Sequence, residues 1–275
     1  MPELPEVETT LRGIKPFLDQ AIISNLVVRN SSMRWPVPIK DLQRLIGQTV
    51  TFVERRAKYI LIHTKSGVIL LHLGMSGSLR VLENTIAAEK HDHVDIELNS
   101  SKVLRLNDPR RFGCCLFIEP NEQAIDEHRL LSTLGPEPLS KKFNVDYLFR
   151  LSRERKVPIK NFIMDGKVVV GVGNIYASES LFQARINPTL KANKVSKARY
   201  KQLVLVIKQV LAKAIKAGGT TLNDFSQVDG KPGYFKQALQ VYAREGEACN
   251  VCQNEIKSII IGQRNTFYCP SCQKN

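Results

Sequence analysis

A change in hydrophobic periodicity divides this chain into two parts. Between residues 21 and 120, apolar residues occur in short runs, several with the alternation of a β-strand, and turn-forming residues separate the runs. The runs are Ile22–Arg29, Val50–Arg56, Tyr59–Thr64, Val68–Leu73, Leu79–Leu82, His93–Leu98, Val103–Leu106 and Cys114–Ile118. Many short strands in succession indicate an antiparallel sandwich or barrel.

Helical patterns lie on both sides of this strand region. The first, over residues 6–19, places Val7, Leu11, Ile14 and Leu18 on one helix face. After the turn-forming run 135–138, helices are expected at Val145–Ser152, Ile159–Met164, Ala177–Ala184 and Ser196–Ala217. We predict an α+β multidomain chain with a helix and strands at 1–120, a linker at 121–138, a helical domain at 139–235 and a cysteine-rich segment at 236–275.

Composition narrows the class of protein. The chain has 275 residues, of which 43% are hydrophobic, and this excludes wholesale disorder. Lys and Arg number 40 against 26 Asp and Glu, a net charge of +14, and basic residues cluster at 55–58 and 150–160. Clustered positive charge favours a nucleic-acid partner over plain solubility. With no bilayer-spanning apolar stretch and no signal-peptide pattern, we expect a cytoplasmic protein without a membrane partner.

Four of the six cysteines form two closely spaced pairs. Cys249 and Cys252 are separated by two residues, as are Cys269 and Cys272, and sixteen residues lie between the pairs. This spacing is typical of zinc sites, and four thiolates leave no open position for a catalytic water. We therefore expect one structural Zn²⁺ per chain. The alternative, two disulfides or unrelated thiols, is disfavoured in a cytosolic protein.

The N-terminus is a candidate catalytic site. If Met1 is removed, Pro2 becomes a terminal secondary amine with a pKa near ~8, so that part of it is uncharged at neutral pH. Such an amine can attack an aldehyde-like carbon and form an iminium, and Glu3 or Glu6 beside it is suited to proton transfer. The alternative is an ordinary helix start at which the acids interact with the helix dipole.

Two segments of the C-terminal half carry candidate phosphate contacts. The run 170–176 is a glycine-rich turn into a helix, with Asn174 as a side-chain donor, although it lacks the third glycine of a dinucleotide-binding motif. The segment between the cysteine pairs is expected to form a hairpin over residues 258–268. Arg264 near its tip is either a phosphate contact or a solvated turn charge.

Two segments of the strand region carry candidate base contacts. The run 108–113 places Arg110 before Phe112, and these residues either contact and wedge between bases or form a charged turn before a core aromatic. Met75 follows a strand and is either a core residue or a second wedge.

Together, these segments resemble bacterial formamidopyrimidine-DNA glycosylase nearly from end to end. The residues that carry the resemblance are Pro2–Glu8, Lys58, His72–Gly77, Lys90–Asp95, Asp108–Gly113, Val170–Glu179 and the four-cysteine tail with Gln263–Arg264. The resemblance implies an N-terminal helix with an eight-stranded antiparallel β-sandwich, a helix–two-turn–helix domain and a C-terminal zinc hairpin. It also implies a lid over the lesion at residues 220–234, and DNA in the cleft between the two domains.

The resemblance further implies a bifunctional enzyme of base excision repair, a DNA glycosylase and abasic-site lyase. Such an enzyme excises oxidised purines, including 8-oxoguanine and formamidopyrimidines, and cuts the strand by β,δ-elimination. By the same resemblance, Pro2 is the nucleophile that forms a Schiff base at C1′, and Glu3 transfers protons. Lys58 is the proton donor in β-elimination and Arg264 in δ-elimination. We expect a monomer acting on double-stranded DNA that contains oxidised bases or abasic sites.

A set of DNA contacts follows from the resemblance and comprises Glu6, Met75, His91, Arg110, Phe112 and Asn174. Met75, Arg110 and Phe112 fill the void left by the extruded base, and Glu6 lies beside that base. The Lys-rich stretch of the family reads Arg153–Lys160 in this chain. Arg155 therefore falls on the DNA-binding position, with Lys156 as the alternative.

Two other functions compete with this hypothesis. An endonuclease VIII-like glycosylase shares the fold and the nucleophile but prefers oxidised pyrimidines, and the segments Pro2–Glu6 and Leu73–Gly77 favour the purine enzyme instead. A non-catalytic zinc protein would bind DNA through the hairpin and the basic clusters without forming a covalent adduct with it.

Overall fold

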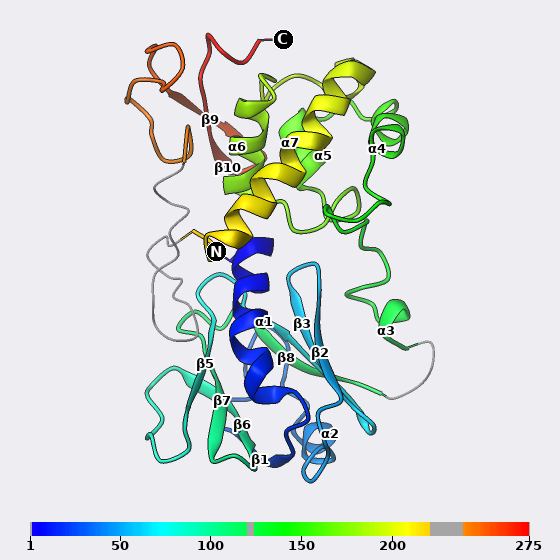
Figure 1. Cartoon of the computed structure of the whole chain (residues 1–275), viewed down its shortest axis with the longest axis vertical. Helices are drawn as coiled ribbons and strands as arrows, with labels where there is room; N and C mark the ends of the chain where they lie inside the picture. Colours follow the sequence, from blue (N-terminus) through cyan, green and yellow to red (C-terminus); the bar gives the residue numbers. More distant parts are fainter. Residues whose placement is uncertain (1, 120–123, 221–238, 275) are drawn as a thin grey trace. The chain divides into compact units, whose positions relative to one another are not determined.

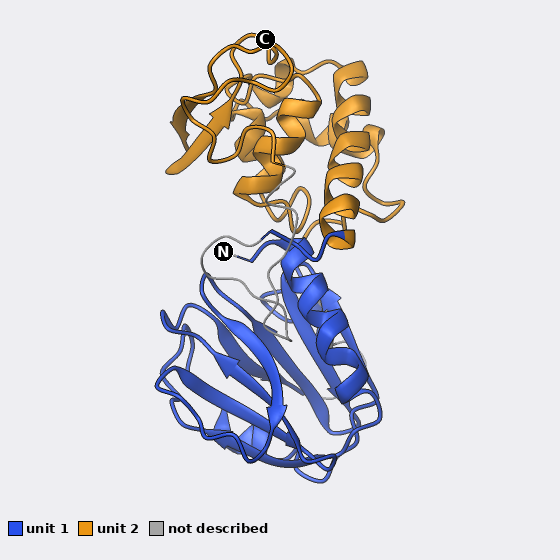
Figure 2. Cartoon of the chain, turned by 60° about the vertical axis from the view of Figure 1, so that its left-hand side comes forward, with its two compact units in different colours: residues 1–132, 217–236 blue, residues 133–216, 237–275 orange. Residues whose placement is uncertain are grey.

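The structure is a computed structural model that describes residues 2–119, 124–220 and 239–274. Packing divides the chain into two compact units, which Figure 2 colours separately. Unit 1 comprises residues 1–132 and 217–236, and unit 2 comprises residues 133–216 and 237–275. The first division lies within the predicted linker, whereas residues 217–236 group with unit 1 and not with the helical residues. The four predicted segments, with their three boundaries, stay predictions.

Unit 1 is built around two four-stranded antiparallel sheets (Figure 1). The first has the order β1-β6-β7-β5, with strands at Ile23–Val28, Asp92–Leu98, Lys102–Asn107 and Ser78–Glu83. The second has the order β2-β3-β4-β8, with strands at Phe52–Arg56, Tyr59–Thr64, Gly67–His72 and Cys114–Ile118. Apolar side chains of both sheets share one core. The predicted eight-stranded antiparallel sandwich is therefore confirmed, and each strand matches its predicted run to within two residues.

Two helices cover the edges of the sandwich. Helix α1 (Leu4–Leu18) packs against the edge strands β2 and β5, and α2 (Ile39–Gln43) packs against the edge strands β1 and β8. Each helix thus spans one edge of both sheets and shields backbone groups that have no strand partner. The apolar stripe predicted for α1 is buried, and Ile14 and Leu18 are fully inaccessible to solvent. The sequence does not predict α2, because five residues carry no periodic signal. A further short helix, α3 (Ala124–Glu127), follows the last strand of unit 1.

Unit 2 is organised around helix α6 (Asn174–Gln183), in which residues 175–182 are all buried. It packs against α5 (Ile159–Met164) and α7 (Lys197–Lys216), and α7 packs against α4 (Val145–Ser152). The 3-10 turn η1 (Ala192–Lys194) precedes α7. Helix α6 begins three residues before its predicted start, because Gly173 caps it with extended backbone and Asn174 becomes its first residue. Within the described residues, no helix is long and apolar enough to cross a membrane.

The cysteine-rich segment forms the predicted hairpin. Strands β9 (Lys257–Ile261) and β10 (Arg264–Tyr268) pair antiparallel, and the turn between them is Gly262–Gln263. Both turn residues have left-handed φ angles, +56° and +60°, typical of the type I′ turn that matches the twist of a hairpin. Arg264 is therefore the first residue of β10, directly beside the turn. A small core behind the hairpin contains Phe182, Val241, Ile256 and Phe267 together with Cys249 and Cys269.

Candidate functional site

The N-terminal end of α1 holds three of the predicted site residues. Pro2 and Glu3 directly precede the helix and Glu6 lies in its first turn. All three are buried, and Glu3 and Glu6 are each only 2% exposed. The Glu3 N–H donates a hydrogen bond to Glu6 Oε2 at 2.8 Å. The positive end of the helix dipole stabilises both carboxylates.

The Glu6 carboxylate also holds the chain at Thr220. Its Oε1 accepts a hydrogen bond from the Thr220 N–H at 2.8 Å, so that one side chain binds two backbone segments far apart in the sequence. Gly219 has a φ of +80°, and a Cβ atom there would lie 3.1 Å from Glu6 Oε1. The approach therefore favours glycine on both conformational and steric grounds. Of the predicted lid at residues 220–234, only Thr220 is described, and the rest lies outside the described residues.

Lys58 lies in the turn between β2 and β3, where Ala57 adopts a left-handed φ of +56°. Arg55 fixes this turn to α1. Its Nε donates to Glu8 Oε2 at 2.9 Å, and its Nη1 donates to the Ala57 carbonyl at 2.8 Å. Because Arg55 and Glu8 are both largely buried, this ion pair holds the Lys58 backbone more firmly than an exposed pair would. The turn that carries Lys58 is therefore fixed to the helix that follows Pro2.

His72 at the end of β4 is held as a neutral imidazole. Its Nδ1 accepts a hydrogen bond from the Gly74 N–H at 2.9 Å, and its ring lies 4.9 Å from the Tyr59 ring. Burial and the positive charges of Lys58 and Arg34 lower the pKa of His72 to about 4, against an opposing effect of Asp108. At neutral pH the residue therefore adds no charge beside Lys58.

This low pKa predicts an acid-sensitive contribution of His72 to stability. The unfolded chain binds a proton at His72 below about pH 6.5 while the folded chain does not, so the contribution is fully present above pH 6.5. It is lost as the pH falls towards 4 and amounts to about 3 kcal/mol. Urea unfolding followed by fluorescence of the single tryptophan, Trp35, measures the slope. His72→Asn keeps a hydrogen-bond acceptor but does not titrate, and we expect a smaller loss of stability between pH 6.5 and 4.5. An unchanged slope would contradict the prediction.

Two loops of unit 1 carry the residues predicted to fill the void in DNA. The β4–β5 loop (73–77) carries Met75, and the β7–β8 loop (108–113) carries Arg110 and Phe112. The Arg110 guanidinium lies 4.7 Å from the Phe112 ring centroid, and Phe112 is 44% exposed. This exposure is large for an aromatic side chain and favours the wedge interpretation over the core one. Met75 is half-buried.

The two loops are in backbone contact. Gly74 has a φ of +62°, and a Cβ atom there would lie 2.4 Å from the carbonyl carbon of Phe112. His91 joins the same region, because its carbonyl accepts a hydrogen bond from the Asp108 N–H at 3.0 Å. The structure thus brings four of the predicted DNA contacts of unit 1 to one end of the sandwich.

In unit 2, Asn174 is joined to the hairpin by Lys160, which the sequence analysis counted in the basic cluster 150–160 and which is buried instead of on the surface. Lys160 in α5 is fully buried, and its Nζ donates to Asn174 Oδ1 at 2.6 Å and to Thr266 Oγ1. Asn174 Nδ2 donates in turn to the Asn265 carbonyl at 3.0 Å. A buried ammonium group needs hydrogen-bond partners in place of water. Through these bonds, Lys160 links α5, α6 and β10. Its only sequence signal is a lysine among apolar helix residues.

The remaining basic candidates lie on the surface of unit 2. Arg264 is exposed at the start of β10. Arg155 and Lys156 are both exposed in the connection between α4 and α5. The Arg155 carbonyl accepts a hydrogen bond from the Asn193 N–H at 3.0 Å, so its backbone is anchored while its side chain remains accessible. Both side chains are exposed and can therefore reach a DNA phosphate.

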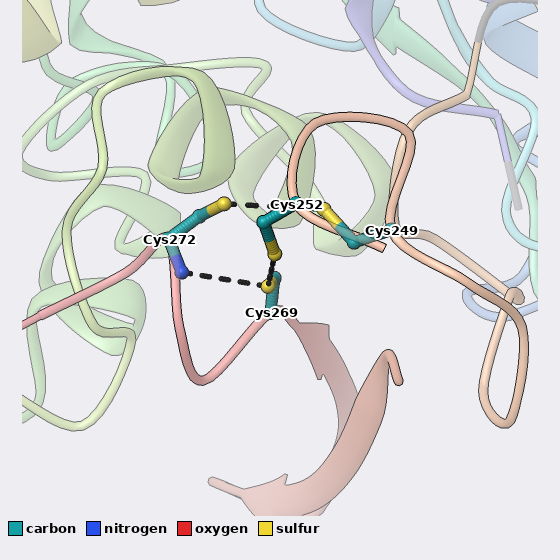
Figure 3. A group of neighbouring side chains, drawn as sticks. All are labelled: Cys249, Cys252, Cys269 and Cys272. Carbon is teal, nitrogen blue, oxygen red and sulfur yellow. Dashed lines mark hydrogen bonds between the residues drawn. The ribbon is translucent and has the colours of Figure 1, made fainter. Parts of the chain in front are cut away.

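The four predicted zinc ligands converge in unit 2. Figure 3 shows the side chains of Cys249, Cys252, Cys269 and Cys272 gathered close together, and their sulfur atoms all lie within 4.8 Å of one another. The Sγ–Sγ distances are 3.9 Å for Cys249–Cys272 and 3.4 Å for Cys252–Cys269. A tetrahedral Zn²⁺ with Zn–S bonds of about 2.3 Å requires sulfur atoms about 3.8 Å apart. The site therefore fits one Zn²⁺.

Backbone N–H groups surround the sulfur atoms, as expected for thiolate ligands. The Val251 N–H donates to Cys249 Sγ at 3.5 Å, and the Cys272 N–H donates to Cys269 Sγ at 3.4 Å. Such bonds stabilise negative charge on sulfur. All four ligand positions are taken by protein, so the metal is structural, and the predicted single zinc is confirmed.

The cavity described in unit 2 is separate from these groups. It has a volume of about 370 Å³ and lies between α7 and the start of α4. Its lining includes Phe143, Leu205 and Lys208 but none of the predicted site residues. The predicted site residues lie on loops, turns and helix ends and do not line this cavity.

Comparison with known protein families matches three consecutive parts of the chain. Residues 1–115 match the formamidopyrimidine-DNA glycosylase N-terminal domain, and residues 134–226 match the H2TH domain of the same enzyme. Residues 246–275 match the zinc finger found in FPG and IleRS. Among curated proteins, the formamidopyrimidine-DNA glycosylase of Alteromonas mediterranea is 57% identical over 275 residues and covers 100% of both chains. That of Actinobacillus pleuropneumoniae serotype 7 is 56% identical over 99% of this chain and 98% of its own.

Solved structures show the same fold. The MutM (Fpg) protein of Thermus thermophilus is 34% identical, with a TM-score of 0.88 over 99% of this chain and 98% of its own. Wild-type Fpg of Lactococcus lactis, solved with DNA containing N7-benzyl-Fapy-dG, is 31% identical with a TM-score of 0.92 over 100% of both chains. The Lactococcus lactis protein was also solved with DNA containing an abasic site, at a TM-score of 0.91.

Proposed function

As the chain belongs to the formamidopyrimidine-DNA glycosylase family, we propose that it excises oxidised purines from duplex DNA and cleaves the strand, with Pro2 as its nucleophile. It is a DNA glycosylase of base excision repair. The observation that carries the assignment of the nucleophile is the placement of Pro2. It lies directly ahead of α1, buried beside Glu3 and Glu6, whose carboxylates can take the proton from a terminal amine.

The chemistry begins when a damaged base leaves the stack, because its C1′ atom is inaccessible inside the duplex. The Pro2 nitrogen forms a bond to C1′ as the glycosidic bond breaks, and the base departs with a proton. The nitrogen then loses its proton, the C1′–O4′ bond breaks as O4′ takes up a proton, and the product is an iminium between Pro2 and the opened sugar. This cation acidifies the C2′–H bond, and loss of that proton releases the 3′ phosphate. A second elimination, at C4′, releases the 5′ phosphate and completes the excision of the sugar.

Glu3 is the group that we assign to proton transfer. As the residue next to Pro2, with its carboxylate buried, it is close to the atoms at which the sugar ring opens and the proton moves. We assign Lys58 to the first elimination and Arg264 to the second. Both cations also neutralise the departing phosphates, which requires only that they lie beside those phosphates.

The DNA contacts that we propose lie in both units. In unit 1, Met75, Arg110 and Phe112 enter the duplex, with Arg110 facing the orphaned base, while His91 contacts phosphate and Glu6 lies beside the extruded base. In unit 2, Asn174 binds phosphate at the N-terminus of α6, and either Arg155 or Lys156 does so from the α4–α5 connection. The zinc supplies no chemistry; it holds the hairpin that carries Arg264. We propose a monomer that works in the cytoplasm on the bacterial nucleoid.

The proposal is tested by borohydride reduction in the presence of a duplex with one 8-oxoguanine opposite cytosine. We expect a covalent protein–DNA adduct, because borohydride reduces the iminium to a stable amine, and without borohydride we expect a cleaved strand. A duplex with one thymine glycol is the comparison substrate. Faster excision of thymine glycol would favour the endonuclease VIII-like alternative. Binding of both duplexes without any adduct or cleavage would favour the non-catalytic DNA-binding protein.

A further inference from the structure

We propose that Asp108 is a positioning residue that locks the Met75 loop (73–77) and the Arg110 loop (108–113) into one rigid wedge, and that extrusion of the damaged base depends on this lock. The inference rests on the proposed function, since it concerns how the wedge side chains are held. It assigns a role in base extrusion to a residue that touches neither the sugar nor the base.

The Asp108 carboxylate bonds to both loops at once. It is completely buried. Its Oδ1 accepts a hydrogen bond from the Ser76 hydroxyl at 2.7 Å, across the gap between the loops. Oδ1 also accepts from the Arg110 N–H at 3.3 Å, and Oδ2 accepts from the Gly113 N–H at 2.8 Å. One side chain therefore fixes the residue after Met75, the backbone of Arg110 and the residue after Phe112.

The backbone of Asp108 is anchored to the sandwich itself. Its N–H donates to the His91 carbonyl at 3.0 Å, and its carbonyl accepts from His93 Nε2 at 2.8 Å. His91 directly precedes β6 and His93 is a buried residue of that strand. The backbone of Asp108 is thus fixed to the sheet by hydrogen bonds, and its carboxylate holds the two loops. The Arg111 N–H also donates to the Asp108 carbonyl, in a turn where Arg111 takes a left-handed φ of +56°.

A carboxylate suits this position because all three partners donate to it in the structure. Its two oxygens together accept from one hydroxyl and two backbone N–H groups. An asparagine has one acceptor oxygen, so its NH₂ group would face a donor whichever way the amide is turned. A buried donor left without an acceptor is costly, and the loops would relax apart to let water in. The side chains of Met75, Arg110 and Phe112 would then no longer be held in fixed positions, while the β-sandwich stayed folded.

This loss should affect one step of the reaction selectively. A wedge must hold its side chains in the helix at the moment the base leaves the stack, and misplacement by about 1 Å costs a large part of a positioned interaction. Nucleophilic attack at an existing abasic site needs no base to be extruded. It depends on the end of α1, which Asp108 does not contact through any of the hydrogen bonds named above. We therefore expect substitution of Asp108 to slow base excision while leaving the rate of reaction with an abasic site nearly unchanged.

The experiment compares Asp108→Asn with Asp95→Asn, a matched control. Asp95 is another buried carboxylate of unit 1, two residues after His93 in β6, and it bonds to Arg105 and Arg29 and not to either loop. Each variant is assayed in single turnover at saturating protein on a duplex with 8-oxoguanine opposite cytosine, and on an abasic-site duplex with borohydride. 2-Aminopurine beside the lesion reports unstacking. For D108N we expect at least about a tenfold slower excision, with the unstacking signal slowed equally and abasic-site trapping changed by less than about threefold. For D95N both reactions should change in parallel, if at all.

Ser76→Ala removes the two hydrogen bonds that the Ser76 hydroxyl makes to the other loop, one to Asp108 and one from the Arg110 N–H. We expect it to slow excision more than abasic-site trapping, by a smaller factor than D108N, and it provides the readout if D108N does not fold. Equal slowing of excision and trapping in D108N, or wild-type rates for excision in folded D108N and S76A, would overturn the inference. Such results leave the proposed function standing. If the wild-type chain gives no adduct with abasic-site DNA, it is the proposed function that fails.

Discussion

A chain that carries a short extension ahead of Pro2 is expected to form no borohydride-trapped adduct with lesion-containing DNA. In the extended chain the Pro2 nitrogen is an amide, whose lone pair is delocalised and cannot attack C1′. Loss of a covalent nucleophile is among the largest single effects in enzymes, so strand cleavage should fall by at least about a thousandfold. DNA binding should change little, because all the groups assigned to it except Glu6 lie on other loops and helices. The same residues added after Asn275 form the control and should leave trapping intact.

Substitution of Pro2 itself gives a graded version of this result. Pro2→Gly retains an amine, but a primary one, so its Schiff base is charged only while it holds a proton. The secondary amine of proline forms an iminium that is always charged and therefore always withdraws electrons from the sugar. We expect P2G to trap weakly and to cleave slowly, in contrast to the inactive extended chain. Full cleavage by the extended chain, with intact-mass confirmation that the extension is present, would refute the assignment of the nucleophile.

Removal of one zinc ligand is expected to abolish the hairpin while sparing the sandwich. Cys252→Ser should reduce the metal content from about one zinc per chain to nearly none, because three thiolates and a weakly binding hydroxyl do not hold Zn²⁺ tightly. The small core behind the hairpin cannot replace metal binding, which in zinc-finger peptides is worth about 10–16 kcal/mol. Loss of β9 and β10 displaces Arg264 and removes the carbonyl and hydroxyl partners of Lys160. DNA affinity should therefore fall at least about a hundredfold.

A second cysteine provides the matched control for this prediction. Cys114 is fully buried in β8, and burial raises the pKa of its thiol to about 12, so it is a packing residue and not a thiolate. Cys114→Ala should keep its zinc and lower the stability of unit 1. Because Trp35 lies in unit 1, its fluorescence should report destabilisation by C114A but not by C252S. Zinc content and DNA affinity that survive in C252S would contradict the structural role of the metal.

The strands and helices were predictable where burial is regular. The alternating runs of unit 1 and the apolar stripe of α7 repeat their signal every two or every three to four residues, so their limits differ from the structure by two residues or less. Helix limits were predicted less well where a single turn of chain sets where a helix starts or whether it forms. Helix α6 starts earlier than predicted because of the cap at Gly173, and α2 was missed because it has only five residues.

The sequence by itself determined the chemistry-bearing groups: a proline behind the initiator methionine, two acids beside it, and four cysteines at zinc spacing. These depend on residues that are close along the chain or on a spacing that a metal imposes. Only the tertiary structure decided which buried polar side chains fix the segments that carry the functional residues. Lys160 bonds to Asn174 and the hairpin, Glu6 to Thr220, and Asp108 to Ser76. Each of these bonds joins segments whose separation in sequence carries no period, and a buried polar side chain finds its partner only after the sheets and helices have packed around it.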